Sequence, residues 1–139
     1  MIRAIVAVDG NNGVGVGDNL AIINKLDQAF FSGYTMGRTC LVGHNTFPQV
    51  ERLRGREIVV DVRGEQHLCI RLNCDFVVIG GVKTYIKYAK YTRELLVTFF
   101  DDINKECNQF LDVYTAYSHL TTREIVYRGD NFKVERWTM

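Results

Sequence analysis

The sequence predicts one α/β domain over residues 1–139, with a mostly parallel central sheet between helical layers and an antiparallel hairpin at its C-terminal edge. Three observations predict this fold class. Segments with strand patterns alternate with segments at helical spacing, as in parallel sheets whose crossovers are helices. The run from Ile2 to Val8 is almost continuously apolar, which is typical of a strand buried on both faces. Near the end of the chain, a turn-rich tetrapeptide at 128–131 separates two strand-like segments.

The first half of the chain contains three of the expected strands and two of the helices. Leu26, Ala29, Phe30 and Phe31 recur at helical spacing and are expected to share one buried face. Pro48, the single proline, is compatible with a helix because it falls in the first turn. The expected elements are strands at 2–8, 39–42 and 57–62 and helices at 24–34 and 46–52.

The second half continues the alternation and then changes to a hairpin. A buried strand ends in the pair Gly80-Gly81, which opens a helix running to about Tyr88. The hairpin supplies the antiparallel edge that an otherwise parallel sheet often carries. The expected elements are strands at 75–79 and 94–99, the helix after 81, and hairpin strands at 123–127 and 132–137.

Composition places the chain among ordinary globular proteins. Hydrophobic residues make up 47% and charged residues 24%, and the formal net charge is +1. No long block of like charge occurs, so the composition favours neither nucleic acid nor a membrane as a partner. The apolar start is interrupted at Asp9, too early for a signal peptide or a membrane span, which predicts a soluble cytoplasmic protein.

The four cysteines have spacings that form neither a CxxC pair nor a zinc pattern. We therefore expect no metal site, and we interpret the cysteines as buried apolar residues in a reducing compartment. They are Cys40, Cys69, Cys74 and Cys107.

Two segments have the form strand, glycine, helix. One is residues 39–46, where the strand ends at Gly43, and the other is residues 76–85, where it ends at Gly80-Gly81. Glycine lets the backbone approach a ligand closely, and a helix N-terminus attracts phosphate. Two such ends in one small domain suit a dinucleotide, although each segment taken alone is more typical of an ordinary tight turn.

Asp27 admits two interpretations from its local sequence. It lies four residues before Phe31 and so shares a helix face with that ring, where apolar neighbours would desolvate the carboxylate and raise its pKa. Alternatively, Asn24 caps the helix and Asp27, three residues later, completes a capping box on the surface. The local sequence alone favours the cap.

The loop at 9–19 and Arg56 also have two interpretations each. The loop is rich in glycine and is either a mobile lid or a plain flexible connection. Arg56 follows Gly55 at the start of a strand and is either a bidentate clamp for a carboxylate or a solvated surface residue.

Taken in order, several motifs resemble those of the dihydrofolate reductase family. The resemblance covers most of residues 1–101, and the last third matches mainly as a terminal hairpin. Because the family's acid stands at this interval between the loop and the Gly43 motif, the resemblance identifies Asp27 as that acid. The matching segments are residues 4–15, Asp27 with Phe31, Val42-Gly43-His44-Asn45-Thr46-Phe47, Gly55-Arg56, Val78-Ile79-Gly80-Gly81 with Tyr85, and Leu96-Val97-Thr98 with Asp101.

The resemblance implies the three-layer fold of that family and the NADPH-dependent reduction of 7,8-dihydrofolate to 5,6,7,8-tetrahydrofolate. Hydride would pass to C6, and Asp27 would anchor the pterin and favour protonation of N5. Phe31 would pack on the substrate rings, Arg56 would clamp the glutamate carboxylate, and Thr98 would bond to the acid. The implied substrate-binding residues are Ile5, Asp27, Phe31, Arg56, Ile79 and Thr98.

The resemblance also implies where NADPH lies. The nicotinamide half would meet the lid, and the phosphates would face the ends of two helices. The implied cofactor-binding residues are Ala7, Val14, Gly15, Asn19, Leu20, Gly43, His44, Asn45, Thr46, Arg63, Gly80, Gly81, Val82, Lys83, Thr84 and Tyr85.

The chain departs from the family pattern at three places. Ala21-Ile22 stands where the family usually has Pro-Trp, and His44 replaces a more basic residue. The stretch 62–75 is much shorter than usual, as in members encoded by compact viral genomes. Arg63, at the end of a strand, is our candidate for the 2′-phosphate.

These departures keep two other functions open. One is a catalytically weak or inactive binding or structural protein that retains the fold, and the other is a reductase acting on a different pterin or pyrimidine. We expect a monomer whose ligands are dihydrofolate and NADPH, together with antifolates such as methotrexate or trimethoprim.

Overall fold

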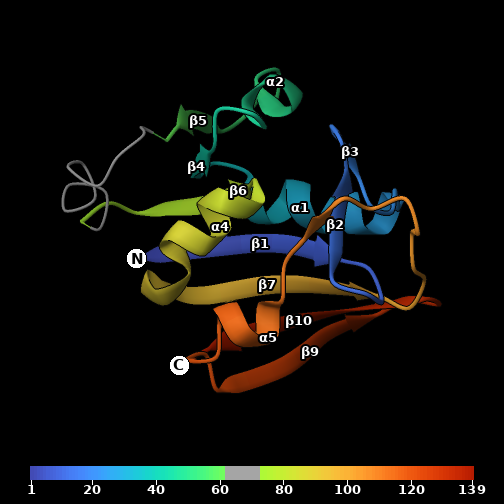
Figure 1. The fold of residues 1–139 in the computed structure, drawn as a ribbon. Coiled ribbons are helices and arrows are strands. Elements are labelled where there is room, and N and C mark those ends of the chain that lie inside the picture. Colours follow the sequence, from blue (N-terminus) through green and yellow to red (C-terminus); the bar gives the residue numbers. More distant parts are fainter. Residues whose placement is uncertain (62–72) are drawn as a thin grey trace.

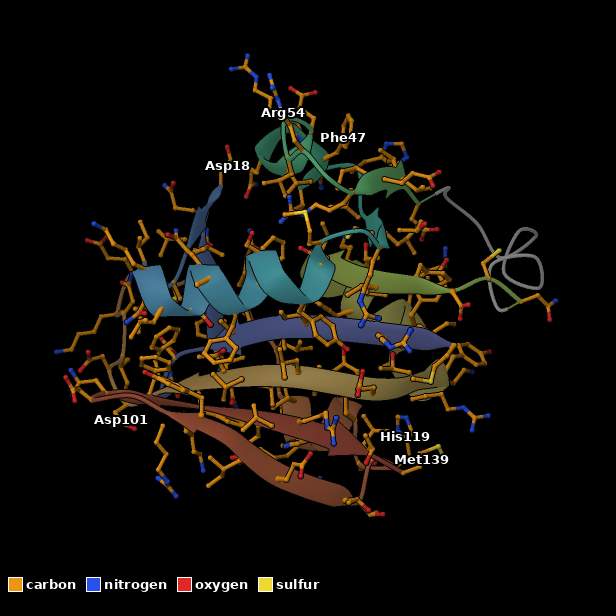
Figure 2. The ribbon with its side chains drawn as sticks, turned by 180° about the vertical axis from the view of Figure 1, so that it is seen from behind. Asp18, Phe47, Arg54, Asp101, His119 and Met139 are labelled. Carbon is orange, nitrogen blue, oxygen red and sulfur yellow. The ribbon has the colours of Figure 1, made fainter. Side chains whose placement is uncertain are left out.

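A computed structural model describes residues 1–61 and 73–139 as three layers around one large sheet (Figure 1). Helix α1 (Lys25–Thr35) covers one face, as the view from behind shows (Figure 2). Helices α4 (Val82–Tyr88) and α5 (Val113–Ala116) cover the other face (Figure 1). The predicted arrangement of a sheet between helical layers is therefore confirmed.

The large sheet has seven strands among the described residues, and five of them form a parallel block. The last two strands run antiparallel to their neighbours and form the predicted hairpin at the edge. The order across the sheet is β5 (Glu57–Val60), β4 (Thr39–Val42), β6 (Phe76–Gly80), β1 (Ile2–Val8), β7 (Thr92–Phe100), β10 (Phe132–Thr138) and β9 (Thr122–Arg128).

Strand β1 lies inside the sheet because its side chains are apolar on both faces. The alternation of a strand sends Ala4 and Val6 towards α4 and α5, into a core that contains Trp137. Ile5 and Ala7 belong to a second apolar cluster on the α1 side. One short run of sequence thus contributes to both cores, and it sets the floor of the cleft described below.

The segment predicted as a loop at 9–19 is partly ordered as strands. β2 (Gly13–Val16) and β3 (Asn19–Leu20) form a hairpin that pairs through β2 with β8 (Gln109–Phe110) in a second, small sheet. The glycine content predicted neither strand. The pairing partner of β2 is β8, which lies about a hundred residues further along the chain, so the local sequence does not reveal it.

Several element boundaries differ from the predicted ones. Helix α2 spans only Phe47–Val50, β5 ends at Val60, and β7 begins at Thr92. The short 3-10 helix η1 (Ala89–Tyr91) joins α4 to β7. No helix of the described residues is long and apolar enough to cross a membrane.

The interpretation of the cysteines as buried residues holds only in part. Cys40 is buried and Cys107 is half-buried, but Cys74 is exposed, so the prediction is wrong for Cys74. Cys74 precedes the first buried residue of β6, Phe76, and therefore lies outside the core. Cys69 lies outside the described residues.

Candidate active site

Asp27 lies in the first turn of α1, where its backbone N–H takes part in the helix cap and its carboxylate bonds to the sheet. The Asn24 side-chain oxygen accepts a hydrogen bond from the Asp27 N–H at 3.0 Å, so Asn24 caps the helix as predicted. The Asp27 carboxylate accepts a hydrogen bond from the Thr98 hydroxyl at 2.5 Å. The cap and the half-buried acid therefore coexist, because the cap uses the backbone of Asp27 and leaves its carboxylate free to meet Thr98.

Burial raises the pKa of the Asp27 carboxyl above its ordinary value, and the hydrogen bond from Thr98 opposes that rise. Phe31 and Phe30 are half-buried on the same helix and pack against the apolar cluster of the α1 side. Leu26 is 51% exposed and Ala29 is also exposed, so the prediction that they share the buried face is wrong. The apolar surroundings of the acid come from the sheet and the two phenylalanines.

The strand register joins the acid to a cleft on the same sheet. Thr98 of β7 is the Cα partner of Ala7 in the parallel β1–β7 pairing. Neighbouring strands lie about 4.8 Å apart. Ala7 lines the cleft, so the Asp27–Thr98 pair lies immediately beside its floor.

The cleft lies where β1 and β6 end, between the β2–β3 hairpin and the start of α4. Its wall contains glycine backbone that carries no side chains, small apolar side chains and a few amides and hydroxyls. Such a surface suits a flat ring with polar substituents, because bare backbone permits close contact. The predicted residues that line it are Ala7, Val14, Gly15, Asn19, Leu20, Asn45, Thr46, Ile79, Gly80, Gly81, Val82 and Tyr85.

The other predicted cofactor residues lie outside this lining. Gly43 and Thr84 pack against each other behind the cleft wall, and His44 and Lys83 are exposed beyond it. Arg63 lies outside the described residues. The roles of these residues stay predictions.

Five residues of the cleft wall were not predicted. Gln109 reaches it from β8, and its amide nitrogen donates to the Gly17 carbonyl at 2.9 Å. Asp18 lies at the outer end of the β2–β3 hairpin, on the same side of the molecule as α2 (Figure 2). No local signal in the sequence marks these positions, and the β2–β8 pairing is what brings Gln109 to the hairpin. The five are Val6, Gly17, Asp18, Gln49 and Gln109.

Tyr85 connects the start of α4 to the cleft floor. Its hydroxyl donates to the Ile5 carbonyl at 2.6 Å, and the side chain is 7% exposed. Burial raises the pKa of Tyr85 well above its ordinary value, so the hydroxyl stays protonated and keeps donating. Ile5, predicted to line the site through its backbone, is thereby fixed in position.

The two strand–glycine–helix segments meet at the cleft. The Gly43 N–H donates to the Gly80 carbonyl at 2.9 Å, and a Cβ on Gly81 would lie 2.9 Å from the Thr46 hydroxyl. The peptide bond between Gly80 and Gly81 is cis. The glycines are therefore required first by the packing of one segment on the other, and this packing leaves bare backbone on the cleft wall.

Substituting Gly43 tests this packing. A Cβ on Gly43 would lie 2.6 Å from the Thr84 hydroxyl, and Thr84 is buried. We expect Gly43→Ala to lower the free energy of unfolding by about 1–3 kcal/mol, as overpacking does. Gly33→Ala is the matched control, because a Cβ there meets nothing within 4 Å on helix α1. The control should raise stability by about 0.5–1 kcal/mol, and equal effects of the two substitutions in urea unfolding would contradict the packing argument.

Arg56 is half-buried and faces α1, so the interpretation as a freely solvated residue is wrong. Its Nε donates to the Thr35 hydroxyl at 3.0 Å, and Nη2 donates to the carbonyl and hydroxyl oxygens of Ser32 at 3.2 and 3.1 Å. Nη1 donates to the Arg54 carbonyl. These bonds hold the guanidinium against the helix that carries Asp27.

The hairpin at the mouth of the cleft is anchored by Asp9. This carboxylate is 3% exposed and accepts hydrogen bonds from the N–H groups of Asn11, Gly13 and Asn104 at 2.7–2.8 Å. Burial alone would raise its pKa, but these backbone donors outweigh burial and lower the pKa below its ordinary value. Asn104 also donates from its side chain to the Ala21 carbonyl at 2.8 Å, so both ends of the hairpin segment are tied to the same loop.

The part of the chain that the structure describes contains no group of three or more His, Cys, Asp or Glu side chains placed to hold a metal ion. The groups at or beside the cleft include the raised-pKa carboxyl of Asp27, the Asp18 carboxyl, hydroxyls, and side-chain and backbone amides.

Comparison with known proteins extends these observations. The family model of dihydrofolate reductase matches residues 1–75, just over half of the chain. The structure is similar to that of a dihydrofolate reductase from Enterococcus faecalis complexed with NADP(H) and RAB-propyl, with a TM-score of 0.77 and 16% sequence identity. That similarity covers 99% of this chain and 95% of the other. No curated protein matches the chain by sequence.

Proposed function

Because this chain belongs to the dihydrofolate reductase family, we propose that it reduces 7,8-dihydrofolate to 5,6,7,8-tetrahydrofolate with NADPH, and that Asp27 anchors the pterin. The observation that carries the proposal is the Asp27–Thr98 pair at 2.5 Å beside the glycine-walled cleft. A half-buried carboxylate next to a slot for a flat ring suits a heterocycle that presents N–H donors.

Asp27 has two tasks in this proposal. It accepts hydrogen bonds from the 2-amino group and ring N–H of the pterin, and its negative charge favours protonation of N5. Burial beside the cleft raises the pKa of the Asp27 carboxyl above its ordinary value. Thr98 fixes the carboxylate through its hydroxyl and leaves the second carboxylate oxygen for the substrate.

The cleft wall fits a nicotinamide dinucleotide. Bare backbone at Gly15, Gly80 and Gly81 admits a flat ring, and Asn45 and Thr46 provide polar groups for the ribose and phosphate portion. When bound there, NADPH supplies the hydride that is added to C6 of the pterin. The chain's own part is to orient the two reactants over Ala7 and to exclude water with the β2–β3 hairpin.

The remaining assignments of the proposal concern the tail, the 2′-phosphate, the location and the inhibitors. Arg56 binds a carboxylate of the glutamate tail, and Phe31 packs on the rings between the pterin and that tail. Arg63 binds the 2′-phosphate, and the cytoplasm is the proposed location. Methotrexate and trimethoprim occupy the pterin site as competitive inhibitors.

The direct test is the loss of NADPH absorbance in the presence of 7,8-dihydrofolate. We expect turnover that requires both reactants and that methotrexate inhibits. Turnover is expected although Ile22 stands where the family usually has tryptophan, because Ile22 packs against the apolar cluster of the α1 side and keeps the end of the hairpin segment apolar. Tight methotrexate binding with no turnover would replace the proposal with an inactive binding protein.

A further inference from the structure

A second hollow lies at the other end of the sheet, where β1 and β7 begin. Its volume is about 930 Å³, within the range of about 300–1,000 Å³ that is usual for small-molecule sites. Its wall is formed by η1, the first residues of β1 and β7, the end of α5 with the residues after it, and Met139. Figure 2 shows His119 and Met139 together at this end of the molecule, away from Asp18 of the cleft. Ile2 of the wall stands five residues before Ala7, so the hollow begins about 17 Å along β1 from the cleft floor.

The charged side chains of this wall are all of one sign. They are Lys90 of η1, Arg93 of β7 and the ionisable His119, and no aspartate or glutamate occurs among the described residues of the wall. The whole chain has 17 lysines and arginines against 16 aspartates and glutamates, so this separation of charge is local. A concave surface lined by one sign of charge concentrates ions of the opposite sign.

These cations contact neutral groups in the part of the chain that the structure describes. Lys90 Nζ lies 5.1 Å from the centroid of the Tyr91 ring, and Arg93 Nη1 lies 3.6 Å from the Met139 sulfur. Neither contact neutralises a charge, so both side chains keep donors for an anionic ligand.

His119 is half-buried and is held in place by β7. Its Nε2 lies 2.7 Å from the Thr92 carbonyl oxygen. Because a carbonyl only accepts, Nε2 carries the hydrogen of this bond, and Nδ1 is left for a ligand. The ring therefore adds a third polar group, from a third element, to those of Lys90 and Arg93.

The two chain ends also lie at this hollow, but they have other partners. The Met1 ammonium forms an ion pair with Asp75. A main-chain oxygen of Met139 accepts a hydrogen bond from the Thr122 hydroxyl at 3.4 Å. The side chains of the wall therefore set its affinity for anions.

The hollow also has an apolar part. Ile2 is 3% exposed, and Tyr91 and Ala116 are half-buried beside it. An apolar floor with a few convergent polar groups is typical of a site for a small organic molecule. Charged and polar groups from three separate elements suit a phosphate, which has three strong acceptor oxygens, better than a carboxylate, which has two.

We propose that this hollow binds a small organic phosphate. Lys90, Arg93 and His119 hold the phosphate, and the apolar body of the ligand packs against Ile2 and Tyr91. This site goes beyond the proposed function, because it lies at the opposite end of the sheet and shares no residue with the cleft.

The test is a titration of the protein with phenyl phosphate, followed by NMR through the backbone amide signals. We expect saturable shifts at residues 90–93 and 118–119. Inorganic phosphate lacks the ring and phenol lacks the charge, so each should bind at this place about tenfold more weakly than phenyl phosphate. The absence of saturable shifts at residues 90–93 and 118–119 overturns the inference, whatever happens at the cleft. Equal affinities for phenyl phosphate and inorganic phosphate also overturn it, because the apolar floor would then take no part.

Two substitutions locate the phosphate. Lys90→Gln and Arg93→Gln each remove one charge and keep a long polar side chain, and each should raise Kd for phenyl phosphate about fivefold, as the loss of an exposed ion pair does. Arg128→Gln is the matched control, because Arg128 is exposed on β9 at the far end of the hairpin from Met139. Its Kd should equal that of the parent. Equal weakening by Arg128→Gln and Arg93→Gln overturns the inference, since it would indicate a general attraction to positive charge.

The outcomes also separate this site from the proposed function. Turnover of dihydrofolate should stay within twofold of the parent in Lys90→Gln and Arg93→Gln, since neither residue lines the cleft. Binding at the hollow without turnover by the parent contradicts the proposed function alone. Turnover without binding at the hollow contradicts this inference alone.

Discussion

Replacing Asp27 with asparagine is expected to lower kcat/KM for dihydrofolate by about 10²–10⁴-fold at pH 7, the usual contribution of a positioned acid or base. Asparagine is nearly isosteric and can still accept the Thr98 hydrogen bond, so the fold is retained. It carries no negative charge, however, and cannot favour protonation of N5. The loss should shrink as pH falls, because solvent then supplies the proton, and a pH profile of kcat/KM measures this.

The same substitution makes an opposite prediction for stability. Burial raises the Asp27 pKa, so the folded state binds a proton more tightly than the unfolded state does. The ionised carboxylate therefore costs stability, and that cost grows as pH rises from about 4 through the folded-state pKa. We expect the Tm of Asp27→Asn to exceed that of the parent at pH 7 and to match it near pH 3.

Thr98→Val is the matched control, because it changes the hydrogen-bond partner of Asp27 and leaves the carboxylate itself in place. It removes the hydroxyl but keeps the charge, and activity should fall much less than in Asp27→Asn. Full activity of Asp27→Asn at pH 7, or a lower Tm there than the parent, would contradict the role given to Asp27.

The large sheet could be predicted because its signals are local. β1 and β6 are apolar runs bounded by polar residues or glycine, and the hairpin of β9 and β10 surrounds a turn-rich tetrapeptide. Such patterns require no knowledge of distant contacts. The covering of both faces by helices is typical of such parallel sheets, whereas the order of the strands was not predicted.

Asp27 illustrates the limit of local patterns. From its neighbours it resembled a cap, and Leu26 was expected to bury it, yet Leu26 is exposed and the carboxylate meets Thr98, 71 residues away in the chain. The assignment came from the order and spacing of several motifs together. That order carries information about tertiary contacts which single segments lack.

The small sheet could not be predicted for a related reason. β2 is glycine-rich and β3 has only two residues; β2 pairs with Gln109 and Phe110 of β8, and β3 pairs with β2. The cleft residue Gln109 was missed with them. Asp9 was used only as the polar residue that ends the apolar start, although it fixes the whole hairpin segment.

Replacing Asp9 with asparagine is expected to lower the free energy of unfolding by about 2–3 kcal/mol at pH 7, because a buried acceptor network is broken. One Asp9 oxygen accepts from Asn11 and Gly13, and the other accepts from Asn104 and faces the Cys107 thiol at 3.7 Å. An amide can replace only one of these oxygens, so its NH₂ group must face an N–H donor. Urea unfolding measures the loss, and Asp130→Asn in the exposed hairpin turn is the matched control.

The pH dependence of this loss has a defined sign. The Asp9 pKa is lowered on folding, so its contribution is fully present above the unfolded-state value of about 4 and is lost as pH falls through the lower folded-state pKa. The difference between parent and Asp9→Asn should therefore be large at pH 7 and shrink below pH 4. Because Asp9 anchors the hairpin that lines the cleft, KM for NADPH should also rise in Asp9→Asn. A loss of unfolding free energy that is equal at pH 7 and pH 3 would show that Asp9 does not act through its charge.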